Sequence, residues 1–115
     1  MEVRRYLTES GRDVFGEWLA GLRDARTVAK IVAPIDRLSV GNFGDCKALR
    51  GGRFELRINW GPGYRIYYAL VGRACVLLLC GGDKSKQSSD IKRALEYLEI
   101  TGKGHHETQG EHFPG

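Results

Sequence analysis

The stretch that decides the fold is FELRINWGPGYRIYY, which spans Phe54–Tyr68. In its first part apolar and polar residues alternate, a pattern typical of a β-strand with one buried and one polar face. The segment Gly61–Gly63 then favours a turn, because proline fixes φ and glycine accepts a positive φ. The stretch therefore predicts a hairpin, and its return strand continues to Val71.

Outward from this hairpin, the sequence predicts three more strands. Ala74–Cys80 contains the run VLLL, which is apolar on both faces, so we expect it to be the central, covered strand. A short strand around Cys46–Leu49 precedes the hairpin, and Val3–Leu7 favours a short edge strand. The glycine pair at 81–82 should end the sheet.

Helical periodicity occupies the region between the first strand and the sheet. Apolar residues recur at helical spacing over Gly11–Leu22, and Ser10 with Asp13 resembles a capping box. A second helix begins after Asp24, and Pro34 should kink it because proline removes a backbone hydrogen bond. The sequence therefore predicts two helices before the hairpin.

A last amphipathic helix follows the sheet, carried by Ile91, Ala94, Leu95 and Leu98. The element order β-α-α-β-β-β-β-α predicts a single α+β domain. We expect the two N-terminal helices to pack on one face of a mainly antiparallel four- or five-stranded sheet, beside a C-terminal helix. The opposite face should then stay open to solvent or a ligand. The domain should span residues 1–99, and residues 100–115 should form a disordered polar tail.

Composition and cysteine usage narrow the class of protein. A chain of 115 residues supports one domain. No apolar run approaches the roughly 20 residues that span a bilayer, and the N-terminus lacks the apolar stretch of a signal peptide. Three cysteines without metal-binding spacing argue against a disulfide framework or a zinc site. We therefore expect a cytoplasmic protein with no membrane partner and no metal.

The positive charge is concentrated in the middle of the chain. Residues 44–93 hold ten basic and four acidic residues, a net charge of +6, whereas the whole chain carries +4. Because this segment coincides with the predicted sheet, it favours a polyanionic partner, and nucleic acid is the first candidate. A solvated charged surface explains the same excess almost as well.

Four stretches together resemble the RelE/ParE superfamily of toxins, within the HigB-like branch known as addiction module killer proteins. They are IDRL (35–38), LSVGNFGDCK (38–47), FELRINWGPGYRIYY (54–68) and VLLLCGGDKSKQSSDI (76–91). This resemblance implies a RelE-like α+β fold and the toxin role in a type II toxin–antitoxin system. It also implies a metal-independent endoribonuclease, or mRNA interferase, that cuts mRNA on the ribosome and inhibits translation without a cofactor. The implied partner is a cognate antitoxin, of a kind that often includes a helix-turn-helix.

Two other functions fit the same resemblance. A ParE-like chain poisons DNA gyrase without a hydrolytic site, and an inactive relative would act as a binding or regulatory protein. Fold alone does not decide between these functions.

Three basic residues are the candidates for a catalytic role. Arg57 lies on the polar face of its strand, and Arg65 lies across the Gly-Pro-Gly hairpin on the partner strand. If the register places both on one face, two guanidinium groups can bind phosphate oxygens. Lys84 follows the strand Ala74–Cys80 and could bind phosphate or protonate the leaving oxygen. Alternatively, Arg57 pairs with an acid such as Glu55 on a solvated face.

Five further residues are candidates for binding nucleic acid: Lys47, Arg53, Tyr67, Lys86 and Gln87. Tyr67 shares the register of the arginines and could stack on an unpaired base, whereas Tyr64 and Tyr68 share the apolar register and favour the core. As an alternative to a functional role for the segment GGDK (81–84), Asp83 could serve only as a turn or cap residue.

No histidine lies in the body of the domain, since all three fall within residues 105–112. Cleavage by the 2′-hydroxyl still needs an acceptor for its proton and a donor for the leaving oxygen. Glu55 and Asp90 are the carboxylate candidates, and the sequence does not choose between them.

Overall fold

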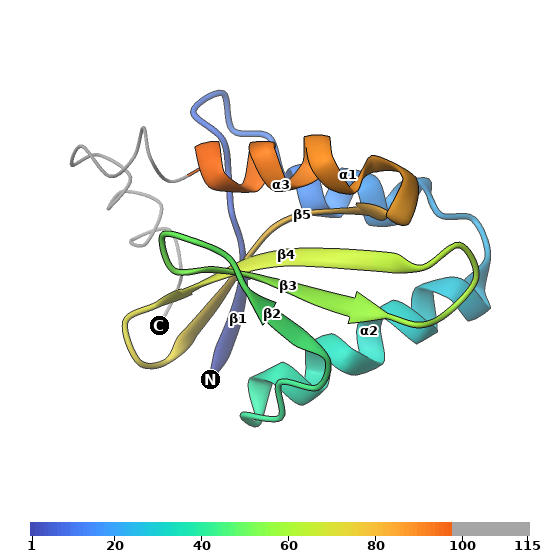
Figure 1. The fold of residues 1–115 in the computed structure, drawn as a ribbon, viewed down its shortest axis with the longest axis horizontal. Coiled ribbons are helices and arrows are strands. Elements are labelled where there is room, and N and C mark those ends of the chain that lie inside the picture. Colours follow the sequence, from blue (N-terminus) through green and yellow to red (C-terminus); the bar gives the residue numbers. More distant parts are fainter. Residues whose placement is uncertain (98–115) are drawn as a thin grey trace.

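The computed structural model describes residues 1–97, which form a three-helix α+β domain (Figure 1). Its elements are β1 (Glu2–Arg5), α1 (Val14–Gly21), α2 (Ala25–Ser39), β2 (Cys46–Ala48), β3 (Arg53–Ile58), β4 (Tyr64–Val71), β5 (Cys75–Asp83), a 3₁₀ turn η1 (Lys84–Lys86) and α3 (Gln87–Glu96). Residues 98–115 lie outside the described part, and so does the expectation of a disordered tail.

The strands of the described part form one five-stranded sheet in the order β1-β5-β4-β3-β2. Strands β3 and β4 form the expected antiparallel hairpin, in which Phe54 faces Tyr68 and Ile58 faces Tyr64. The edge strand β1 runs parallel to β5, whereas the other neighbours are antiparallel, so the sheet is mixed. Strand β5 is covered on both faces as expected, but β4 occupies the middle of the sheet.

Apolar residues are buried on both faces of the sheet. On one face Ile31, Ile35 and Leu38 of α2 pack against residues of β3, β4 and β5. On the other face Ala94 of α3 packs with residues of β4 and β5. Figure 1 shows α2 on one side of the sheet and α3 on the other. The expectation of an open second face is therefore wrong, because α3 covers part of it.

The helices start where side chains cap them. Asp13, rather than Ser10, caps α1 by accepting a hydrogen bond from the Gly16 amide at 2.9 Å, so this helix starts later than expected. Asp24 caps α2 as predicted, through the Arg26 amide at 3.0 Å. Each cap satisfies an amide that has no partner within the helix.

The glycine pair at 81–82 continues the sheet instead of ending it. Both residues belong to β5 and face β4, Gly81 opposite Ile66 and Gly82 opposite Arg65. Larger residues would not fit at these two positions, since a Cβ on Gly81 would lie 2.4 Å from the Trp18 ring. A Cβ on Gly82 would lie 2.0 Å from the Asp90 carboxylate. The pair therefore lets α1 and α3 approach the same strand from opposite faces.

Asp90 is a buried carboxylate whose titration should influence stability. Its side chain is 5% exposed, Oδ1 accepts a hydrogen bond from Arg93 at 3.3 Å, and Oδ2 makes no hydrogen bond. Burial raises the pKa of Asp90, while the charges of Arg93 and Lys86 partly oppose the rise. Because the folded pKa exceeds the unfolded value, the folded state binds the proton more tightly. Stability should therefore fall as pH rises through the interval between the two pKa values.

We expect Asp90→Asn to increase the free energy of unfolding at pH 7, because the amide removes a buried charge without changing the side-chain shape. The gain should shrink as pH falls toward about 4, the pKa of an unfolded aspartate. Urea unfolding of the parent and the variant across this range measures the difference. Asp36→Asn, at an exposed position of α2, is the matched control. An Asn variant that is less stable at pH 7 would contradict the prediction.

No helix within residues 1–97 has the length and apolar content needed to cross a bilayer.

Candidate functional site

The hairpin register brings the three predicted cations to one pocket. Arg57 and Arg65 are direct partners across β3 and β4, so both side chains emerge on the same face of the sheet. Both residues and Lys84 line a pocket of about 190 Å³, together with Asp45 and Asn59. We refer to this space as the cation pocket. Its wall carries three positive side chains and one carboxylate, so an anion is the ligand that its charge favours.

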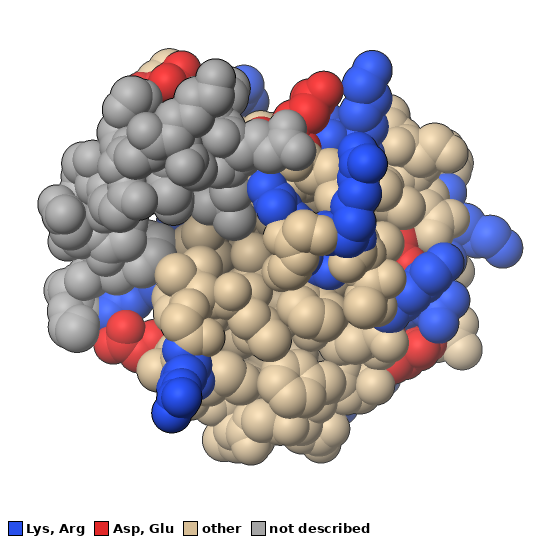
Figure 2. Space-filling view, turned by 60° about the vertical axis from the view of Figure 1, so that its left-hand side comes forward, with Lys and Arg blue, Asp and Glu red and all other residues tan. Residues whose placement is uncertain are grey.

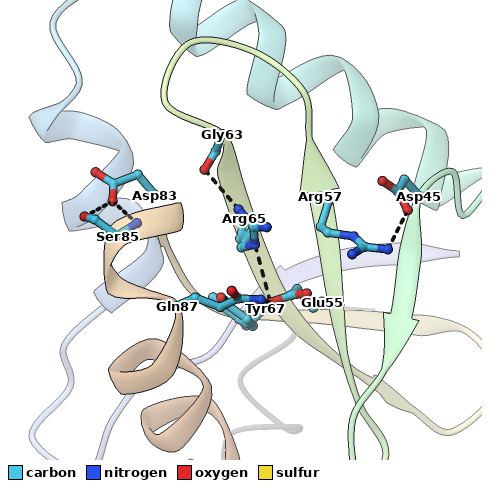
Figure 3. A network of polar contacts seen from close by, with 9 residues as sticks. All are labelled: Asp45, Glu55, Arg57, Gly63, Arg65, Tyr67, Asp83, Ser85 and Gln87. Carbon is cyan, nitrogen blue, oxygen red and sulfur yellow. Dashed lines mark hydrogen bonds and ion pairs between the residues drawn. The ribbon is translucent and has the colours of Figure 1, made fainter.

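Arg65 is held in a fixed position at the centre of this region (Figure 3). Its Nη1 donates to the Gly63 carbonyl oxygen at 3.3 Å, and its Nε lies 3.6 Å from Glu55 Oε2. The second distance makes an ion pair but is too long for a hydrogen bond. A Cβ on Gly63 would lie 3.6 Å from Arg65 Nη1 and 3.7 Å from Lys84 Cβ, so the hairpin turn packs closely against both residues.

Glu55 lies beneath Arg65 and is fully buried. Its Oε2 accepts hydrogen bonds from the Tyr67 hydroxyl at 3.1 Å and from Gln87 Nε2 at 2.9 Å. Burial, followed by the charge of Glu55, raises the pKa of Tyr67, so this hydroxyl remains a donor. Tyr67 and Gln87 thus hold the Glu55 carboxylate in place, and Glu55 in turn holds Arg65. These contacts join β3, β4 and α3.

The same network corrects the predicted role of Tyr67 and gives Gln87 a structural contact. The Tyr67 ring is completely buried and offers no face to an unpaired base. Gln87 is bound to Glu55 and orients that carboxylate. Tyr67 lies in the polar register of β4, but α3 covers that register here, and Gln87 is the first residue of α3.

Arg57 points away from Arg65 and toward Asp45, as Figure 3 shows. Its Nη2 donates to Asp45 Oδ1 at 3.1 Å, and its backbone amide donates to the Asp45 carbonyl at 2.9 Å. The two side chains are 41% and 65% exposed, so this surface ion pair adds little stability and can open readily. Arg57 is thus paired with an acid, but that acid is Asp45, whereas Glu55 faces Arg65.

Asp45 is the residue that sequence reasoning missed. It precedes the short strand β2, and only the pairing of β2 with β3 brings it beside Arg57. The carboxylates proposed from the sequence, Glu55 and Asp90, are 0% and 4% exposed and do not line the cation pocket. Asp45 does line it.

Asp83 has a clear structural role at the start of η1. Its carboxylate accepts hydrogen bonds from the amide and the hydroxyl of Ser85. These bonds lower the pKa of Asp83 and fix the turn that carries the exposed Lys84. The interpretation of Asp83 as a cap is therefore correct.

The remaining basic candidates occupy different environments. Arg53 is 8% exposed, and its guanidinium donates to the carbonyl oxygens of Ala94, Leu95 and Tyr97, so it caps the end of α3. This placement corrects its predicted role in nucleic-acid binding. Lys47 and Lys86 are exposed, but neither lines the cation pocket.

Charge alone does not mark the site. Figure 2 shows one face of the molecule, where Lys and Arg side chains stand in separate groups with uncharged surface between them. Acidic side chains lie beside several of these groups. The geometry of the cation pocket is therefore more informative than the net charge.

Comparison with known proteins finds a relative of similar sequence. No family model matches the chain. An uncharacterized protein of Haemophilus influenzae is 54% identical over 80 residues, which cover 70% of this chain and 81% of that protein.

Proposed function

We propose that this chain, which belongs to the same family as the Haemophilus influenzae protein, is a ribosome-dependent mRNA endonuclease. In this proposal it is the toxin of a type II toxin–antitoxin module with a RelE-like fold. The observation that carries the proposal is the cation pocket, in which Arg57, Arg65 and Lys84 meet one carboxylate. The sequence resemblance to HigB-like toxins supports the same conclusion.

The pocket contains groups for each part of a transesterification. The 2′-oxygen of the RNA attacks the neighbouring phosphorus, its proton passes to the Asp45 carboxylate, and the bond from phosphorus to the 5′-oxygen breaks. Lys84 donates a proton to the leaving 5′-oxygen, and the products are a 2′,3′-cyclic phosphate and a 5′-hydroxyl end. Arg65 binds the phosphate oxygens and stabilises the negative charge of the transition state.

The contacts of Arg65 support its assignment as the main phosphate-binding residue of the pocket. Its guanidinium is held by Glu55 and by the Gly63 carbonyl before a substrate arrives. A preorganised charge stabilises a transition state without reorganisation at the moment of reaction. Arg57, in contrast, must exchange Asp45 for phosphate, and this exchange would free Asp45 to accept the proton.

The proposed partners are mRNA on the ribosome and a cognate antitoxin, and the proposed location is the cytoplasm. A free nuclease of this kind would harm its host, so an antitoxin has to block either the cation pocket or entry to the ribosome. We expect the antitoxin to include a helix-turn-helix.

A gyrase poison is the second candidate. The observation in its favour is that the two arginines of the pocket already face carboxylates, Arg57 on Asp45 and Arg65 on Glu55. A binding module without hydrolytic activity would tolerate such neutralised cations. The two candidates differ in the target that is damaged in the cell.

Induction of the chain in growing bacteria separates these candidates. We expect growth arrest, with primer extension showing mRNA cuts in phase with codons. Lys84→Ala should abolish most of the cuts, while Lys92→Ala, which removes an exposed lysine of α3 outside the pocket, should leave them unchanged. An SOS response with intact mRNA would support the gyrase poison instead. Growth at the normal rate with intact mRNA would contradict both.

A further inference from the structure

A second pocket adjoins the cation pocket and shares one wall with it. It has a volume of about 330 Å³ and lies between the C-terminal half of α2, the loop of residues 42–45 and strand β3. Asp45, Arg57, Ile58 and Asn59 line both pockets. The two pockets therefore lie next to each other, with these four residues lining both.

The lining of the second pocket combines apolar surface with polar groups. Pro34, Phe43, Leu56 and Ile58 supply the apolar part, and Arg37, Asn42 and Asn59 supply polar side chains. Phe43 is 37% exposed, although large aromatic residues are usually buried in a small domain. The sheet face behind it is already filled by Leu56 and Ile58, which are 2% and 7% exposed.

The loop that carries Phe43 has a defined conformation. Gly41 and Gly44 adopt φ values of 83° and 58°, which residues with a side chain rarely adopt. The Cys46 thiol donates to the Phe43 carbonyl oxygen at 2.6 Å, and the Gly44 amide donates to Asn42 Oδ1 at 3.3 Å. These contacts hold Phe43 at the pocket rather than leaving it on a loose loop.

We propose that this second pocket binds one unpaired nucleobase of RNA, next to the phosphate bound in the cation pocket. The inference rests on the proposed function and names a further part of the same substrate. A nucleobase has apolar faces and a polar edge, and the pocket offers Phe43 to a face and the amide of Asn59 to an edge. The shared wall places the ribose at Arg57 and Asp45, between base and phosphate.

Charge selects RNA over an apolar protein segment as the occupant. The described polar lining includes Arg37 and Arg57 beside a single acid, Asp45, and the pocket shares four lining residues with the cation pocket. An apolar side chain of a protein would bring no anion to Arg37, since Asp45 is already paired with Arg57, whereas a nucleotide supplies a base and a phosphate together. Stacking on an aromatic ring accepts any base, because every base has a π-face.

The test measures binding of the labelled full chain to ribosomes programmed with synthetic mRNA. The A-site codon carries 2′-deoxyribose to prevent cleavage, and in three further mRNAs one nucleotide of the codon lacks its base. For the parent chain, removal of the base at one position should weaken binding about 5- to 150-fold, the range of one stacked base. Phe43→Ala should show a similar loss with the intact codon.

The combination of the two changes gives the decisive result. For Phe43→Ala, removal of the same base should cause no further loss, because the two changes remove one interaction. Phe43→Tyr should bind like the parent, since it keeps the ring, and Val40→Ala, at a position 80% exposed and outside the pocket, should do the same. Circular dichroism verifies the fold of each variant.

Two results would overturn the nucleobase pocket and leave the nuclease intact. One is equal binding by Phe43→Ala and the parent, and the other is two losses that multiply as independent effects. A Phe43→Ala variant that loses only its antitoxin would assign the pocket to a protein side chain. If the parent does not bind programmed ribosomes at all, the proposed function fails together with the pocket.

Discussion

Replacement of Arg65 by Ala is expected to lower mRNA cleavage by about 10²- to 10³-fold, the typical effect of removing one preorganised charge donor. Arg65→Lys should restore only part of the activity, because an ammonium cannot bind two phosphate oxygens in the planar manner of a guanidinium. Primer extension and growth arrest measure both variants. Arg73→Ala, in the exposed turn between β4 and β5, is the matched control and should behave like the parent.

The stability of these variants has to be measured as well. The Arg65 side chain is 12% exposed and faces the fully buried Glu55, so its removal leaves a buried carboxylate without its cation. Such a loss is typically destabilising by a few kcal/mol. The double variant Glu55→Gln/Arg65→Ala removes both charges of this ion pair. The single variant Glu55→Gln is its control, because it differs from the double variant only at Arg65. If the folded double variant cuts mRNA as well as Glu55→Gln does, Arg65 is not part of the catalytic site.

Arg53→Ala is expected to lower the free energy of unfolding by about 2–4 kcal/mol while leaving the cation pocket intact. The Arg53 guanidinium donates to the carbonyl oxygens of Gly51, Ala94, Leu95 and Tyr97. Three of these carbonyls lie at the end of α3 and lose their charged donor in the variant. Urea unfolding followed by the fluorescence of Trp18 and Trp60 measures the loss.

The control for this prediction is Arg50→Ala, which removes an exposed arginine from the adjoining turn and should change stability by less than about 0.5 kcal/mol. Arg53→Lys should be intermediate, because one ammonium cannot reach carbonyls of three residues at once. Unfolding of Arg53→Ala at the same urea concentration as the parent would show that water replaces the guanidinium without loss.

The hairpin was predictable from the sequence because strand periodicity and turn chemistry are local. The alternation over Phe54–Trp60 identified the inward residues Leu56 and Ile58, and the turn at Gly61–Gly63 set Arg57 opposite Arg65. The position of both arginines and Lys84 around one pocket follows from that register and from the return of β5 alongside β4.

The environment of the second sheet face was not predictable in the same way. A period of two separates the faces of a strand but does not reveal what packs on each face. Arg53, Glu55 and Tyr67 have the spacing of a solvated face, yet α3 and its C-terminal carbonyls bury them. Asp45 was missed for a related reason, since its neighbour Arg57 lies twelve residues away and only strand pairing joins them.

The parallel pairing of β1 with β5 has a consequence for the order in which the sheet can form. Glu2 faces Cys75 and Arg5 faces Leu78, so β1 pairs with the strand that lies farthest from it in sequence within residues 1–97. Contacts so distant in sequence form slowly because a long loop must close first. Because β5 is also the last strand of the described part to be synthesised, β1 cannot join the sheet until every other strand has been made.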